Sequence, residues 1–148
     1  MSTISFDSFA SRGFFPSSCR FENSTKIGIL LFIDISNNYV TAINNAFDNI
    51  TLLERLMIHS NLIENVPDDA FRTNGNLKEL SMHSNKISWL GKHAFRGLVT
   101  LVELNLSNNR LKSLNDSLSF MPSLTLLKLV GNQLLLLGDN EFMNLPQL

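Results

Sequence analysis

The chain has 148 residues, 44% of them hydrophobic, which suffices for one modest core but not for two domains. Twelve Lys and Arg residues stand against thirteen Asp and Glu residues, a formal net charge of -1, so the chain lacks the basic excess that attracts nucleic acids and anionic membranes. Composition therefore predicts a single domain and argues against a nucleic-acid partner.

Residues 1–29 lie outside the pattern that fills the rest of the chain, and we expect them to be irregular or to form a makeshift N-terminal cap strand over residues 19–29. They contain no basic start followed by a continuous apolar run, so no signal peptide is predicted. The longest apolar stretch, residues 27–35, is too short to span a membrane, so no membrane segment is expected. Cys19 is the only cysteine, which excludes an internal disulfide and, taken alone, favours a reducing compartment.

Residues 30–148 are built from five copies of one motif, with a sixth copy cut off at residue 148. Each copy fits LxxLxLxxNxL with conservative swaps and begins at Leu30, Leu53, Leu77, Leu101 or Leu124. The asparagines of the motif are 23, 24, 24 and 23 residues apart, at Asn38, Asn61, Asn85, Asn109 and Asn132. Because so short a unit cannot bury its apolar side alone, stacked copies must share one continuous core.

Within each copy, apolar and polar residues alternate as in a short strand with one buried face. The inward residues are expected to be Leu56, Ile58, Leu80, Met82, Leu104 and Leu106, with Met57, Ser81 and Asn105 pointing outward. The asparagine ladder should pair backbone groups where the chain turns out of each strand, since an amide both donates and accepts hydrogen bonds. The second half of the unit predicts a stacked spine of Phe47, Phe71, Phe95 and Phe142, with Leu118 in the fourth copy.

These five copies resemble the leucine-rich repeat family in its typical subtype of about 24 residues. The resemblance implies an α/β solenoid: a curved arc with a concave parallel β-sheet and a convex side of loops and short helical turns. This subtype is similar to repeats in Toll-like receptors, matrix proteoglycans and neuronal adhesion receptors, which bind ligands outside the cell. The chain departs from those members because it has one N-terminal cysteine and no C-terminal cap, so we expect it to be a fragment, an incomplete gene model or one segment of a longer protein.

The outward positions of the strands are the predicted site for a protein ligand, because aromatic, Met and Arg side chains are enriched at interfaces. An ordinary solvated sheet face is the alternative. The ligand-binding residues on the concave face would be Phe32, Asp34, Arg55, Met57, His59, Glu79, Ser81, His83, Glu103, Asn105 and Lys128.

His59 and His83 occupy the same place in adjacent copies, about 4.8 Å apart in backbone position. Two imidazoles that close could sense pH or take part in binding a metal. Because no third ligand stands beside them, two surface histidines without such a role are the favoured interpretation, and no metal site or cofactor is predicted.

Four N-x-S/T sequons are present, of which Asn23, Asn49 and Asn115 are the glycosylation candidates. Asn105 lies inside a strand, where the repeat itself generates the sequon. Together with the repeat subtype, the sequons favour an extracellular or cell-surface recognition module, a receptor or adhesion ectodomain fragment. An intracellular scaffold or regulatory subunit in the cytoplasm and a structural spacer are the alternatives, and no motif indicates an enzyme.

Overall fold

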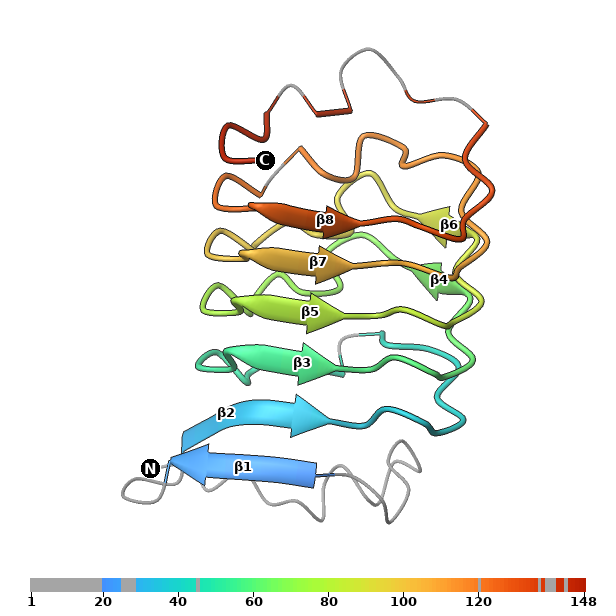
Figure 1. Cartoon of the computed structure of the whole chain (residues 1–148). Coiled ribbons are helices and arrows are strands. Elements are labelled where there is room, and N and C mark those ends of the chain that lie inside the picture. The colour runs from blue at the N-terminus through green and yellow to red at the C-terminus, as the bar shows by residue number, and fades with distance from the viewer. Residues whose placement is uncertain are drawn as a thin grey trace.

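The computed structural model describes residues 20–24, 29–44, 46–119, 121–135, 137, 141–142 and 144–148. Eight strands follow one another along this part of the chain, and the turns of the coil stack in sequence order (Figure 1). They are β1 (Arg20–Ser24), β2 (Ile29–Asp34), β3 (Arg55–Met57), β4 (Asn65–Val66), β5 (Glu79–Ser81), β6 (Trp89–Leu90), β7 (Glu103–Asn105) and β8 (Leu126–Lys128).

One sheet of six strands, in the order β1-β2-β3-β5-β7-β8, runs along one side of the molecule. From β2 to β8 its neighbours are parallel, and each strand contributes the same motif positions: Leu56 pairs with Leu80, and Leu80 with Leu104. At one edge β1 pairs antiparallel with β2. A separate pair, β4 and β6, is also parallel. The predicted solenoid with a parallel sheet is confirmed.

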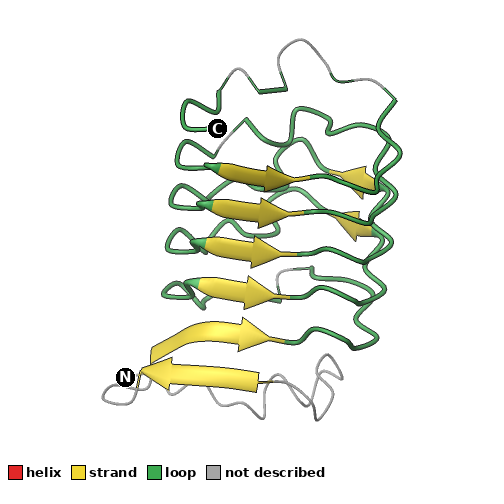
Figure 2. Ribbon diagram, in the orientation of Figure 1, coloured by secondary structure: helices red, strands yellow, loops and turns green. Residues whose placement is uncertain are grey.

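The return side of each coil consists of turns, and no helix occurs among the described residues (Figure 2). Single turns stand where short helical turns were expected, closed by backbone hydrogen bonds such as Ile50 N to Phe47 O at 3.2 Å and Leu53 N to Ile50 O at 3.2 Å. The cause is local, because buried residues recur every third position here, as in Phe47, Ile50 and Leu53. That spacing matches a tight three-residue turn rather than a continuing α-helix.

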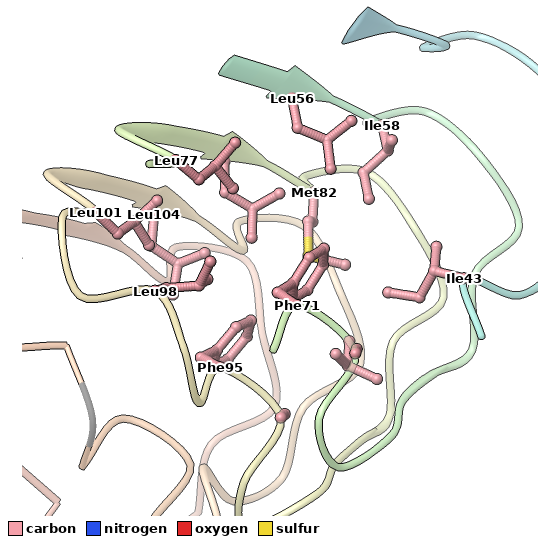
Figure 3. Close-up of a cluster of buried hydrophobic side chains, with 14 of the residues drawn as sticks. Ile43, Leu56, Ile58, Phe71, Leu77, Met82, Phe95, Leu98, Leu101 and Leu104 are labelled. Carbon is pink, nitrogen blue, oxygen red and sulfur yellow. The ribbon is translucent and has the colours of Figure 1, made fainter. Parts of the chain in front are cut away.

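We call each repeat, one turn of the coil, a rung. The core lies between the sheet and the return turns, and its side chains come from every middle rung (Figure 3). All six predicted inward strand residues have no exposed surface, Leu56 and Met82 among them. Phe71 lies between Phe47 and Phe95, with ring centroids 6.2 Å apart on both sides. Leu118 is equally buried in the next rung.

The prediction that Phe142 joins this spine is wrong, because its side chain is 38% exposed. Phe71, Phe95 and Leu118 each lie between two rungs, whereas Phe142 belongs to the last described rung of the coil.

The ladder asparagines connect each rung to the one before it. Asn85 accepts a hydrogen bond from Ile63 N at 3.1 Å and donates to Ile58 O and Met82 O, both at 3.0 Å. The same contacts recur at Asn61, Asn109 and Asn132. Asn38 donates to Ile35 O and Ser36 O. One side chain per rung thus pairs backbone groups that stacking removes from water.

The residue before each ladder asparagine adopts a left-handed backbone conformation, with φ between 54° and 75°. These five residues are Asn37, Ser60, Ser84, Asn108 and Gly131. The conformation turns the chain out of the strand, and asparagine and glycine adopt it at low cost. Serine does so less readily, so Ser60 and Ser84 occupy their positions at some cost in stability.

Candidate functional site

The parallel strands align their outward residues into three columns, which together form the open sheet face. Pairing of the strands brings Phe32, Arg55, Glu79, Glu103 and Leu126 into the first column. The second column is Asp34, Met57, Ser81, Asn105 and Lys128. The third, just beyond the strands, is Ser36, His59, His83, Ser107 and Val130. The structure therefore brings all eleven predicted ligand-binding residues onto one surface.

Several of the charged groups on the open sheet face are held by neighbours. The Arg55 guanidinium lies over the Phe32 ring, 4.9 Å from its centroid, which is within the range of a cation–π interaction. Lys128 Nζ contacts Glu103 Oε1 at 2.6 Å. The Asp34 carboxylate accepts hydrogen bonds from the backbone N–H and the hydroxyl of Ser36. These contacts hold polar groups in place at the start and end of the sheet.

Glu79 differs from the other charged residues of this face. Its neighbours in the first column are Arg55 and Glu103, but Arg55 is turned to Phe32 and Glu103 is bonded to Lys128. In the part of the chain that the structure describes, the Glu79 carboxylate makes no ion pair or side-chain hydrogen bond. The middle of the face therefore presents an uncompensated carboxylate.

His59 and His83 stack on each other in the third column. Their ring centroids are 4.3 Å apart and their planes differ by 9°. Each Nδ1 lies beside the hydroxyl of the following serine, at 3.2 Å for Ser60 and 3.0 Å for Ser84. Partial burial lowers the pKa of His83 below its usual range, and the nearby His59 and Lys128 lower it further. His83 therefore favours its neutral form more than a free imidazole does.

The second column is less accessible than the alternation alone suggested. Ser81 occupies an outward position but is only 7% exposed, so its small side chain is covered by larger neighbours. Asn105 is half-buried, and its side-chain oxygen accepts a hydrogen bond from Ser107 N at 3.0 Å. A ligand would reach Met57 and the histidines before it reached Ser81.

Sequence reasoning did not single out the serine hydroxyls that position the histidine rings. Ser60 and Ser84 stand directly before ladder asparagines, and the sequence HSN occurs in both rungs. That repeated tripeptide was the available signal, since a hydroxyl next to an imidazole can bond its Nδ1. The two rungs share ring position, hydroxyl partner and backbone conformation.

The four sequons differ in their surroundings. Asn49 is exposed in a return turn. Asn115 is also exposed, but its side-chain amide donates a hydrogen bond to Leu90 O at 3.0 Å. Asn105 lies in β7 in the middle of the sheet, where a glycan would cover the open sheet face. Asn23 lies in β1, and its side chain is outside the described residues. Asn49 is therefore the most accessible of the described candidates.

A family model for the leucine rich repeat matches residues 51–111 and, in a second alignment, residues 76–134, which together cover more than half of the chain. The chain belongs to the leucine-rich repeat family. The matched region contains β3 to β8 and the ladder asparagines from Asn61 to Asn132, so the family match and the observed coil cover the same repeats.

Solved structures of other leucine-rich repeat proteins resemble this chain. A chain of the TLR13–ssRNA13 complex is 26% identical with a TM-score of 0.78, over 91% of this chain and 19% of that one. A chain of the Drosophila Toll–Spatzle complex is 28% identical with a TM-score of 0.66, over 70% and 15%. An internalin from Listeria monocytogenes is 28% identical with a TM-score of 0.64, over 80% and 33%.

This chain therefore spans a third or less of the length of each of these proteins. No curated protein sequence matches it significantly. Among the described residues, no helix is long and apolar enough to cross a membrane.

Proposed function

We propose that this leucine-rich repeat chain is a recognition module that binds a protein ligand on its open sheet face, outside the cell or at its surface. The observation that carries the proposal is the alignment of Phe32, Arg55, Met57, His59 and His83 on one continuous surface. Aromatic, Met and Arg side chains fixed in place lose little freedom on binding, which favours their use at interfaces.

The charges of the open sheet face favour a protein over a nucleic acid. Three carboxylates, Asp34, Glu79 and Glu103, stand against the two cations Arg55 and Lys128, and Lys128 is already bonded to Glu103. Binding to a phosphate backbone needs an excess of cations. One structural neighbour was solved with single-stranded RNA and another with Spatzle. For this chain the balance of charge supports a protein ligand rather than RNA.

The extracellular location is supported by the exposed sequon at Asn49 and by the resemblance to receptor repeats. Peptide mass mapping of the native protein before and after N-glycosidase treatment tests it. Conversion of Asn49 to Asp would show passage through the secretory pathway. Unmodified Asn49, Asn115 and Asn23 peptides throughout would contradict the proposal and favour the cytoplasmic scaffold.

The binding face can be tested without knowing the ligand by placing a photo-crosslinking residue at Met57 or, as the control, at the exposed Arg72 of a return turn. We expect a discrete cross-linked partner from position 57 and none from position 72. The double charge reversal Arg55→Glu and Glu79→Lys should reduce that product at least about tenfold, since it changes both central charges of the face. An equal yield from both positions, or no effect of the reversal, would contradict the assignment.

A further inference from the structure

We propose that the side of the solenoid next to β6 binds a linear sulfated polysaccharide, through the basic cluster of Lys86, Arg110 and Lys112 and the indole ring of Trp89. The strands β4 and β6 form a small sheet of their own, beyond the ends of the strands that carry the open sheet face (Figure 1). The site is therefore separate from the open sheet face, and the inference goes beyond the recognition of a protein ligand.

The repeat places the three cations of the basic cluster next to one another. Lys86 and Arg110 each follow a ladder asparagine directly, and Lys112 lies two residues after Arg110. Arg110 N donates a hydrogen bond to Ile87 O at 2.8 Å, which fixes the two rungs against each other. Ile87 and Leu111 are fully buried, so the residues that alternate with them point away from the core. The cations thus form a continuous group over two adjacent rungs.

The charges of the basic cluster are available to a ligand, because none of its three side chains makes an ion pair or a side-chain hydrogen bond among the described residues. Between the ladder asparagine and the return turn, the described part of these two rungs holds one carboxylate, Asp116, which is paired with Lys92 at 3.7 Å. The preceding rung adds Glu64 and Asp68, and Asp68 accepts a hydrogen bond from His93 N at 2.7 Å. Three cations therefore face one carboxylate, that of Glu64, that has no such partner.

Trp89 supplies an apolar platform beside the basic cluster. It belongs to β6, and its side chain is 47% exposed. Its partner in β4 is Asn65, and the equivalent residue of the next rung is Ser113, so short polar side chains flank the indole on both sides. The electron-rich face of an indole attracts the weakly positive C–H groups of a sugar ring. Ring and cations together match a ligand that carries its negative charges on sugars.

The make-up of this surface favours a sulfated polysaccharide over a nucleic acid. Proteins that bind single-stranded nucleic acids stack successive bases on several aromatic side chains along a basic groove. Here one indole and three cations cover two rungs. A single sugar ring on Trp89 brings its sulfates to the neighbouring cations, and the planar guanidinium of Arg110 can donate two hydrogen bonds to one sulfate.

Trp89 is the only tryptophan of the chain, so its fluorescence reports on this site directly. The experiment titrates the whole chain with a heparin oligosaccharide of defined length, at increasing salt concentration. We expect a saturable change of the emission and an affinity that falls with salt, because binding releases counterions. Hyaluronan has carboxylates but no sulfates, and with fewer charges it should bind at least about tenfold more weakly.

Variants separate the contribution of charge from that of stacking. The triple variant Lys86→Gln, Arg110→Gln and Lys112→Gln should weaken heparin binding about tenfold, as expected for the joint loss of three solvent-exposed ion pairs, and should reduce its salt dependence. Trp89→Ser, measured by calorimetry, should also weaken binding but leave the salt dependence unchanged, because stacking releases no counterions.

A matched triple variant controls for net charge. Arg72→Gln, Lys78→Gln and Lys128→Gln remove the same number of cations from other parts of the surface. Because salt screens distant charges, this variant should retain the affinity within about twofold. The inference is overturned if heparin binds without changing the Trp89 emission, if the control loses as much affinity as the cluster variant, if a single-stranded RNA of equal charge binds more tightly, or if no saturable binding occurs.

Discussion

The rungs that contain β3, β5 and β7 differ from the last rung, which follows β8, although all are built from the same motif. In the middle rungs the inward leucines are fully buried and the phenylalanines stack. Toward the end of the coil Leu127, in β8, and Leu129 and Leu134, after it, are only partly buried. The sequence pattern is equal in both regions, so the difference arises from the number of neighbours that each rung has.

The comparison extends to the position just before each spine residue. Ala70, Ala94 and Ser117 fill this position in successive rungs and are fully buried, whereas the last rung has Glu141 there, 5% exposed. One Glu141 carboxylate oxygen has no hydrogen-bond partner among the described residues. A repeat can therefore keep its backbone path while its last copy carries a side chain that the middle copies would not tolerate.

The largest expected effect comes from the spine. Phe95→Ala should lower the free energy of unfolding by about 3–5 kcal/mol, because the ring is fully buried against Phe71 and its loss leaves a cavity. Phe142→Ala, in the last rung, should cost less than about 1 kcal/mol. Urea unfolding of both variants measures the difference. Equal losses would show that the last rung is packed as tightly as the middle ones.

A smaller effect is expected from the asparagine ladder. Asn85→Ala should destabilise the chain by about 1–3 kcal/mol, since Ile63 N, Ile58 O and Met82 O lose their partner inside the coil. Asn132 makes the equivalent bonds but is only half-buried, so water can replace its amide and Asn132→Ala should cost less. Thermal unfolding of the two variants tests this order, and a larger loss at Asn132 would reverse it.

Much of the fold could be predicted from spacing alone. Asparagines 23 or 24 residues apart fix which residues share a rung, and the alternation around Leu56, Leu80 and Leu104 fixes which side of each strand is buried. Both features depend only on the length of the repeat and on the alternation of apolar and polar residues within it. For the same reason the columns of the open sheet face, including the adjacency of His59 and His83, could be read from the sequence.

The features that the sequence did not predict depend on contacts between rungs. The motif placed Phe142 in the spine, but its burial depends on how the neighbouring rung packs on it, and its side chain is 38% exposed. Adjacency placed His59 beside His83, but their stacking depends on the two serine hydroxyls that hold the rings. The single turns that stand where short helical turns were expected have a local cause instead, the three-residue spacing of buried side chains.

The smallest expected effect is the pH dependence of the stability of the last rung, which contains Glu141. Burial raises the pKa of Glu141 above its ordinary value of 4.5, a backbone hydrogen bond from Asp116 opposes this, and the negative charge of Asp116 adds to it. Because the folded state favours the protonated form, ionisation costs it free energy. The stability of the last rung should therefore fall as the pH rises from about 4.5 toward neutral, and acidification should restore it.

Hydrogen exchange of peptides that cover residues 141–148, measured from pH 4 to pH 7 and corrected for intrinsic rates, follows this rung. Glu141→Ala restores the residue found at Ala70 and Ala94 and should raise protection at pH 7 by about 1 kcal/mol, the lower end of the cost of an unpaired buried acceptor. It should also remove the pH dependence. Glu64→Gln, at an exposed position, should change neither. If protection in the unaltered chain instead rose with pH, the Glu141 carboxylate would be stabilised where it lies, and the contrast between the middle and last rungs would rest on packing alone.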